Sequence, residues 1–402
     1  MLTRRFALLG ATLLAGGPAI AVRAPRGKAM HTAEAETSSG GAASTPLGPL
    51  DTAARWAFAM DFNTNAELLN KAADEEMPPS SMTKLMTLYI AYSRLKEGRL
   101  KLDDTLPISE HAWRMGGSKM FVQVGEQVRV EDLIRGIEVD SGNDACIVLA
   151  EAIAGSESQF AALMNETAKK VGLTHSNFRN STGWPDPDQH MSARDIAMLA
   201  AAIIREFPDY YHYASEKTFK YNNIEQGNRN PLVQKGTADG LKTGHTEAGG
   251  FGLAASTLRG NRRVILVLNG LTSMHQRAEE GERLMDWAFN NFEDVVLFGS
   301  NEPIEQVPVW LGAAPTVPLV VGDAGDLVVT MPRNWRKAAT VKLDYETPVR
   351  APVARGTRLG SLRIAGQGVP SMQVPLVAGA DVDRLGLPGR AMAVLAHYVR
   401  GG

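Results

Sequence analysis

The chain has 402 residues, more than one ordinary hydrophobic core accommodates, so two domains are expected. A hydrophobic content of 44% with 21% charged residues indicates a globular protein and argues against a disordered or fibrous one. The formal net charge of −2 leaves no compositional case for a nucleic-acid partner, because nucleic-acid-binding domains are normally basic.

The N-terminal segment is typical of an export signal. Arg4 and Arg5 precede an apolar run of small residues from Phe6 to Ile20, and residues 19–21 have the small-x-small form of a cleavage site. We therefore predict a signal peptide over residues 1–21 and an exported protein of the periplasm or cell envelope. The paired arginines and their neighbours also resemble a twin-arginine signal, which leaves the Sec and Tat routes open. An uncleaved membrane anchor is the alternative.

The next two segments differ sharply in pattern. Residues 22–50 are small and polar without a period, which predicts a flexible linker. Residues 51–296 alternate between helical and strand-like patterns and would form the first domain. Helical periodicity is expected in the stretches 81–98, 130–136, 143–154, 157–171, 192–206 and 276–291, and strands at 250–257 and 263–269. This mixture predicts an α+β domain with helices on an antiparallel sheet.

The pattern changes again towards the C-terminus. Residues 297–380 contain short apolar strands at regular spacing, separated by Gly and Pro, and predict a small all-β domain. That domain could be a rigid spacer or a platform for a partner. Residues 381–402 form a tail in which Arg390 to Arg400 is weakly amphipathic, so peripheral contact with the inner membrane remains open.

Ser81 and Lys84 form a Ser-x-x-Lys motif at the start of a predicted helix, and a spacing of three places both side chains on one face. A serine hydroxyl is a poor nucleophile at neutral pH and needs a base within hydrogen-bond distance. A lysine can be that base if burial or a nearby positive charge lowers its pKa. A second copy, Ser93 with Lys96, falls inside the helix, where the backbone donors are already used, and is interpreted as surface.

Two further tripeptides carry candidate chemistry. In the Ser-Gly-Asn stretch, Ser141 can relay a proton and Asn143 can hold a peptide group. In the Lys-Thr-Gly stretch, Lys242 adds positive charge, Thr243 can bind a carboxylate, and Gly244 allows substrate to approach the strand edge. Each tripeptide alone is as readily a helix cap or a protected edge strand.

The three motifs in this order resemble those of the penicillin-interacting serine enzymes. Longer stretches resemble the low-molecular-mass penicillin-binding proteins of the serine D-alanyl-D-alanine carboxypeptidase family. The resembling stretches are Gly117–Phe121, Ser141–Cys146, Leu163–Asn165 with Gly172–Leu173, and Asp239–Thr246. The similarity runs from about Asp51 to Phe292, and the β-rich tail is similar to that family's C-terminal domain.

The resemblance implies a role for each motif residue in cleaving the pentapeptide stem of peptidoglycan. Ser81 would attack the carbonyl between two terminal D-alanines, with Lys84 as base. Ser141 and Lys242 would pass a proton to the leaving amine, and Asn143 would position the peptide. β-Lactam antibiotics would acylate the same serine and act as covalent inhibitors.

The resemblance also implies the groups that bind the substrate. The backbone N–H groups of Ser81 and His245 would form the oxyanion hole, and Thr243 would take the free carboxylate. Arg277 matches the arginine that assists Thr243. No cofactor is implied, and no histidine or carboxylate cluster has the spacing of a metal site. The one cysteine, Cys146, excludes an internal disulfide and is expected to face the core.

Other activities remain as alternatives. A class A β-lactamase shares the acylation step but needs a carboxylate, normally in Glu-x-x-Leu-Asn, to activate the deacylating water. The nearest stretch, residues 161–165, begins with Ala161, so slow turnover of β-lactams and inhibition are expected. A transpeptidase or endopeptidase could use the same acyl-enzyme, and a non-catalytic cell-wall scaffold is the non-enzymatic alternative.

Overall fold

The computed structural model describes residues 41–322, 325–366 and 369–399, so the expected signal peptide lies outside the described residues. Regular structure begins earlier than the sequence suggested. β1 (Gly41–Ala43) pairs antiparallel with β2 (Leu50–Thr52), and Ala43 is buried. A flexible linker reaching residue 50 is therefore wrong for residues 41–50. Burial and strand pairing hold this stretch of small residues, although its composition favours a linker.

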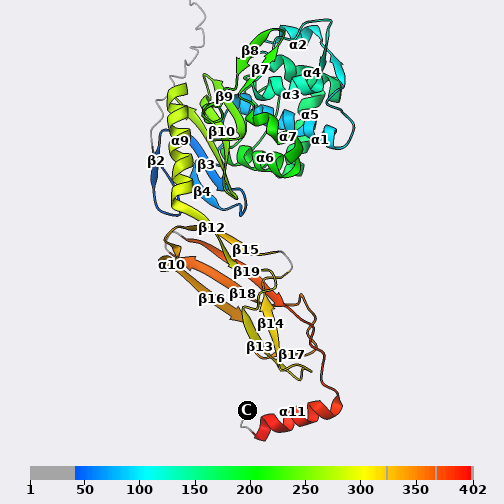
Figure 1. Ribbon diagram of the computed structural model, residues 1–402, viewed down its shortest axis with the longest axis vertical. Helices are drawn as coiled ribbons and strands as arrows, with labels where there is room; N and C mark the ends of the chain where they lie inside the picture. The colour runs from blue at the N-terminus through cyan, green and yellow to red at the C-terminus, as the bar shows by residue number, and fades with distance from the viewer. Residues whose placement is uncertain (1–40, 323–324, 367–368, 400–402) are drawn as a thin grey trace, which may run out of the picture. The chain divides into compact units, whose positions relative to one another are not determined.

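A five-stranded antiparallel sheet lies at the centre of the first part of the chain (Figure 1). In spatial order its strands are β4 (Glu67–Lys71), β3 (Trp56–Asp61), β11 (Arg262–Leu271), β10 (Gly250–Arg259) and β9 (Gly240–Thr246). The side chains of Ile265 and Val267 belong to one hydrophobic cluster and those of Leu266 and Leu268 to another. Successive strand residues point to opposite faces, so the sheet is covered on both sides.

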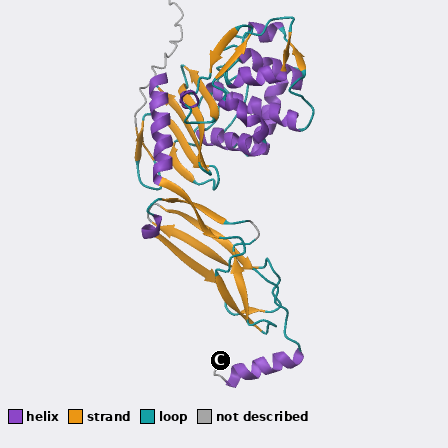
Figure 2. Ribbon diagram, in the orientation of Figure 1, coloured by secondary structure: helices purple, strands orange, loops and turns teal. Residues whose placement is uncertain are grey.

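Helices cover both faces of the central sheet. They are η1 (Ser80–Thr83), α1 (Lys84–Lys96), α2 (Glu110–Arg114), α3 (Val130–Glu138), α4 (Asn143–Ala154), α5 (Glu157–Val171), α6 (Ala193–Glu206), α7 (Pro208–Tyr211), η2 (His212–Ser215), α8 (Pro231–Lys235) and α9 (Met274–Asn291). Buried residues of α1, α3, α4, α5 and α6 share the larger cluster, whereas α9 packs on the other face (Figure 2). Cys146 lies within the larger cluster, as expected. The α+β prediction is confirmed.

Two small hairpins flank the helices. The first joins β5 (Thr105–Pro107) to β6 (Gln127–Arg129), and the second joins β7 (Thr218–Tyr221) to β8 (Ile224–Gly227). The second hairpin contacts the loop between α2 and β6, because the side-chain amide of Gln226 donates to the carbonyl of Lys119 at 2.8 Å. The sequence patterns did not predict either hairpin.

The C-terminal part is almost entirely β-structure, as predicted. β12 (Phe292–Phe298) pairs with β15 (Leu327–Pro332). A six-stranded sheet has the order β16 (Ala339–Tyr345), β18 (Arg358–Gly366), β19 (Val369–Ala378), β14 (Thr316–Val320), β13 (Glu305–Trp310) and β17 (Val349–Arg350). Apolar side chains from both sheets form one core. A single helical turn, α10 (Trp335–Ala338), and a terminal helix, α11 (Leu387–Val399), complete the described chain.

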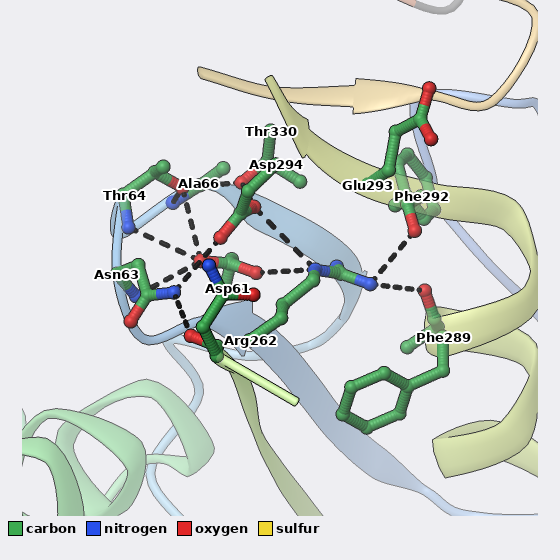
Figure 3. A network of polar contacts seen from close by, with 12 residues as sticks. Asp61, Asn63, Thr64, Ala66, Arg262, Phe289, Phe292, Glu293, Asp294 and Thr330 are labelled. Carbon is green, nitrogen blue, oxygen red and sulfur yellow. Dashed lines mark hydrogen bonds and ion pairs between the residues drawn. The ribbon is translucent and has the colours of Figure 1, made fainter. Parts of the chain in front are cut away.

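A buried polar network links β3, β11 and the start of β12 (Figure 3). The guanidinium of Arg262 donates to a carboxylate oxygen of Asp61 at 2.8 Å and to the backbone carbonyl of Phe292 at 2.9 Å. Asp294 lies 3.5 Å from the same guanidinium and accepts a hydrogen bond from the Thr330 hydroxyl at 2.9 Å. The network therefore couples the central sheet to the first strand pair of the C-terminal part.

Candidate active site

Ser81 lies in η1, directly before α1. Nζ of Lys84 is 2.8 Å from Oγ of Ser81 and donates to the backbone carbonyl of Thr182 at 2.5 Å. Lys84 is 0% exposed, and this burial is the main reason why its pKa is lowered to about 8, with the positive charge of Arg229 acting in the same direction. A buried amine with a lowered pKa, in contact with a hydroxyl, has the arrangement of a general base beside a nucleophile.

The second copy of the motif makes different contacts. The hydroxyl of Ser93 donates to Glu97, and Nζ of Lys96 donates to the backbone carbonyl of Glu206. Both contacts are exposed to solvent, in keeping with the surface interpretation.

The turn that carries Ser81 is held by residues that the sequence patterns did not single out. Ser80 has a left-handed backbone (φ 50°), and its hydroxyl lies 2.9 Å from the hydroxyl of Thr246 on β9. Gly183 packs so closely that an added Cβ would lie 1.8 Å from the carbonyl oxygen of Ser80. An added Cβ at Gly244 would lie 3.3 Å from the backbone nitrogen of Ser81 and 3.0 Å from Ser80. Gly244 thus allows β9 to pack against the nucleophile turn.

Ser141 and Asn143 form the turn that enters α4. Ser141 is buried with φ at 58°, a conformation that costs an ordinary residue about 1–2 kcal/mol. The side-chain amide of Asn143 donates to the carbonyl of Gly116 at 2.8 Å, and its backbone N–H donates to the carbonyl of Ser118. Both bonds connect the turn to the loop between α2 and β6, so the amide is held in a fixed place.

Asp144 is a further residue that the sequence patterns missed. Its carboxylate accepts backbone N–H groups from Met120, Phe121 and Val122 at 2.9–3.2 Å. Charge-assisted bonds of this kind are stronger than those between neutral groups. The carboxylate therefore fastens the loop to the Ser-Gly-Asn turn.

The Lys-Thr-Gly motif lies on β9, the last strand in the order of the central sheet, which pairs with β10. Lys242 and Thr243 are both buried. The pKa of Lys242 is lowered, first by burial and then by the positive charge of Lys84, so these two amines are close enough to affect each other's protonation. His245 is exposed and stacks on Phe251 of β10, with ring centroids 4.0 Å apart.

Arg277 is buried at the start of α9. Its guanidinium donates to the backbone carbonyl of Arg229 at 3.3 Å, and burial together with the charge of Arg229 lowers its pKa to about 10. Beside it lies Arg229, which the sequence patterns missed and whose side chain donates to the hydroxyl of Ser118. The site thus gathers four cationic side chains, two lysines and two arginines, and is suited to an anionic group on a substrate.

A cavity of about 480 Å³ adjoins the nucleophile turn. It is lined by residues 76–80, 183–187, 189 and 190, and by Thr246 and Ala248. Trp184 lies at its margin, is 45% exposed, and approaches Gly116 and Gly117. The cavity thus lies beside Ser80 and Gly183, next to the turn that carries Ser81.

Over residues 41–322, 325–366 and 369–399, no three His, Cys, Asp or Glu side chains are grouped in a way that could hold a metal ion.

Two family models match the chain. The model described as D-alanyl-D-alanine carboxypeptidase matches residues 41–272, and the model described as penicillin-binding protein 5, C-terminal domain, matches residues 292–384. The carboxypeptidase DacC of Escherichia coli is 37% identical over 342 residues, covering 82% of this chain and 84% of the relative. DacA of Haemophilus influenzae is 36% identical, covering 85% of this chain and 88% of the relative.

Solved structures agree with these matches. Penicillin-binding protein 5 from Haemophilus influenzae superimposes with a TM-score of 0.76 at 35% identity, covering 84% of this chain and all of that chain. Penicillin-binding protein 6B from Escherichia coli superimposes with a TM-score of 0.67 at 34% identity, covering 81% of this chain and 95% of that chain. Penicillin-binding protein D2 from Listeria monocytogenes, in the ampicillin-bound form, superimposes with a TM-score of 0.55 at 25% identity, covering 60% of this chain and 98% of that chain.

Proposed function

Since the chain belongs to the D-alanyl-D-alanine carboxypeptidase family, we propose that it removes the terminal D-alanine from the pentapeptide stem of peptidoglycan through an acyl-enzyme on Ser81. The observation that carries this proposal is the 2.8 Å contact between Oγ of Ser81 and the buried amine of Lys84. The reaction is a serine-type peptide hydrolysis in which these two groups act as nucleophile and base.

Acylation begins when Lys84 takes the hydroxyl proton of Ser81 as Oγ attacks the carbonyl between the two D-alanines. The backbone N–H groups of Ser81 and His245 stabilise the oxyanion, a contribution that is large in a water-excluded site. The C–N bond then breaks, and the leaving amine of D-alanine receives a proton through Ser141 and Lys242. The products of this half-reaction are free D-alanine and an ester on Oγ.

Substrate recognition follows from the charge of the site. The terminal carboxylate of the stem is an anion, and it binds beside Lys242, Thr243 and Arg277, with Arg229 adding positive charge. Asn143 keeps one amide hydrogen and its carbonyl oxygen for the peptide bond, because its other hydrogen is used on Gly116. The part of the stem before the scissile bond extends towards the cavity beside Ser80 and Trp184.

Deacylation separates this enzyme from a β-lactamase. Ala161, where a β-lactamase of class A would have its catalytic carboxylate, is a buried residue of α5, and its backbone carbonyl accepts the amide of Asn165 at 3.0 Å. No acid is available at this position to activate water against a β-lactam ester. We therefore expect β-lactams to form long-lived adducts on Ser81 and to inhibit, and rapid turnover of a chromogenic cephalosporin would contradict this.

The decisive experiment is release of D-alanine from a muramyl pentapeptide, measured with the wild-type protein and with Ser81→Ala. The wild type should release D-alanine and the variant should not. Mass spectrometry of the penicillin-treated protein should find one adduct, on Ser81. An active Ser81→Ala variant, or an adduct on another residue, would overturn the proposal.

The same function places the protein outside the cytoplasm, in the cell envelope. We propose peripheral attachment to the inner membrane through α11, because this helix buries none of its residues. Its most exposed apolar side chains are Leu387, Met392, Leu395, Tyr398 and Val399. No single helix of the described chain is long and apolar enough to cross a membrane. A form truncated after Arg384 should leave the membrane fraction, and unchanged fractionation would exclude α11 as the anchor.

A further inference from the structure

A carboxylate that the mechanism above does not use lies at the start of α5. Glu157 is the first residue of that helix, and its side chain is 20% exposed. Its Oε1 accepts two hydrogen bonds from Ser181, one from the backbone N–H at 3.0 Å and one from the hydroxyl at 2.7 Å. Ser181 is buried and comes directly before Thr182, whose carbonyl accepts the amine of Lys84. The carboxylate therefore binds the neighbour of a residue that contacts the catalytic base.

The peptide groups around Ser181 and Thr182 are held one after another. The Ser181 carbonyl accepts the hydroxyl of Thr87 at 2.6 Å, and the Thr182 carbonyl accepts Nζ of Lys84 at 2.5 Å. Thr87 and Lys84 are three residues apart on α1, so one face of that helix holds two successive carbonyls. The side-chain oxygen of Asn180 accepts the backbone N–H of Thr182 at 3.2 Å.

Glu157 adds a contact from a second helix. The two bonds to the carbonyls come from α1, and Asn180 belongs to the segment itself, whereas Glu157 belongs to α5. Hydrogen bonds to a carboxylate are stronger than those between neutral groups. Because adjacent peptide groups share a Cα atom, holding Ser181 limits the directions in which the Thr182 carbonyl can point.

The two oxygens of Glu157 have separate contacts. Oε2 lies 3.9 Å from Nε2 of His111, whose Nδ1 lies 3.2 Å from Glu151 of α4. Oε1 is the oxygen that both donors of Ser181 share. A glutamate in the first turn of a helix also interacts favourably with the helix dipole, so an experiment has to separate that effect from the bonds to Ser181.

We propose that Glu157 is a positioning residue for the acylation of Ser81. By holding Ser181 from α5, it fixes the carbonyl of Thr182, which in turn fixes the amine of Lys84 beside the hydroxyl that this amine deprotonates. This role rests on the function proposed above, because it requires Lys84 to be the base. Glu157 acts through Thr182 and Lys84 and not by contact with the reacting atoms.

The test is acylation of the full-length Glu157→Ala protein by a penicillin, with stopped-flow kinetics that separate the noncovalent dissociation constant from the acylation rate constant. The variant removes both bonds to Ser181, so the Thr182 carbonyl no longer holds Lys84 in one direction. The rate constant should fall about 10–100-fold, the usual effect of displacing a reacting group by about 1 Å, and the dissociation constant should not change. An unchanged rate constant, or binding weakened as much as acylation, would overturn the proposal.

Two further variants separate this role from an effect on folding or on the helix dipole. Glu157→Gln removes the charge but keeps an oxygen that accepts both donors of Ser181, so it should restore most of the acylation rate that Glu157→Ala loses. Glu151→Ala is the matched control, because Glu151 is the other carboxylate beside His111 and should leave the rate unchanged. A Glu157→Gln protein as slow as Glu157→Ala, or a slow Glu151→Ala protein, would contradict the assignment.

Ser181→Ala tests the same contact if Glu157→Ala does not fold. It leaves α5 intact and removes the hydroxyl bond to Glu157, whereas the backbone N–H bond remains. The acylation rate constant should fall by a smaller factor than in Glu157→Ala, again with an unchanged dissociation constant, and a wild-type rate would count against the proposal. Failure of the wild type to acylate at Ser81 would instead contradict the proposed function itself.

Discussion

Nζ of Lys84 lies 2.8 Å from Oγ of Ser81, and the backbone carbonyl of Thr182 holds the same nitrogen from the other side at 2.5 Å. The amine therefore has one fixed direction in which to accept a proton. This geometry depends on two segments far apart in the sequence, because the segment around Thr182 packs on η1 through Gly183.

Replacing Lys84 with Met should slow acylation of Ser81 by a penicillin about 10²–10⁴-fold, the usual contribution of a positioned base. Lys96→Met is the matched control, since Lys96 belongs to the second Ser-x-x-Lys copy on the same helix and contacts the carbonyl of Glu206 and the ring of Phe207. Stopped-flow acylation measures both. Equal rates for the two variants would contradict the role of Lys84.

The wild-type acylation rate should rise with pH up to about pH 8. The free amine is the base, and burial lowers the pKa of Lys84 to about 8, so the base is scarce below that pH and gains population through it. Between pH 5 and 7 the rate should increase about tenfold for each pH unit. A rate independent of pH over this range would show that Lys84 is not the proton acceptor.

Arg277→Ala should weaken binding of the substrate carboxylate. A charge-assisted hydrogen bond is worth about 1.5–3 kcal/mol, so kcat/KM should fall about 10–100-fold, mainly through KM. Arg259→Ala is the control, because Arg259 forms an exposed pair with Asp286 on the surface. D-alanine release over a range of peptide concentrations gives both constants, and an unchanged KM would remove Arg277 from the binding site.

Gly183→Ala should impair both stability and acylation. The added Cβ would meet the carbonyl oxygen of Ser80 at 1.8 Å, so the nucleophile turn must shift. Gly260 is the matched control, since it also has a left-handed backbone (φ 64°) but nothing lies within 4 Å of an added Cβ. Gly260→Ala should cost only about 1 kcal/mol and leave acylation unchanged. Thermal unfolding and the acylation rate together distinguish the two variants.

The pair of Asp61 and Arg262 offers a test of stability away from the site. Arg262→Met leaves the buried Asp61 carboxylate without its partner and should destabilise the protein by about 3–5 kcal/mol. A double variant that also carries Asp61→Asn should recover part of this loss, because Asp294 is then the one carboxylate left without its ion pair to Arg262, and it keeps the hydrogen bond from the Thr330 hydroxyl. Denaturant unfolding measures both, and a double variant less stable than the single one would contradict this explanation.

The motif residues could be predicted from the sequence because each motif is local. Ser81 and Lys84 are one helical turn apart, and Lys242, Thr243 and Gly244 are consecutive residues of one strand. The α+β architecture followed equally from local periodicity, and the all-β character of the C-terminal part from its short, regularly spaced strands.

The rest depends on contacts between distant segments. Arg229 lies in a stretch without a distinguishing pattern, and its contacts with Ser118 and Arg277 arise only in the fold. Asp144 follows a recognisable motif, yet its function as an acceptor for residues 120–122 required the structure. β1 was missed because a three-residue strand of Gly and Ala has the composition of a linker.

Two glycines, Gly183 and Gly244, enclose the turn of Ser81 with bare backbone on either side. A side chain at Gly183 would displace the backbone of Ser80 and with it Ser81, and one at Gly244 would press on the same turn, so the position of the Ser81 hydroxyl depends on the absence of two β-carbons.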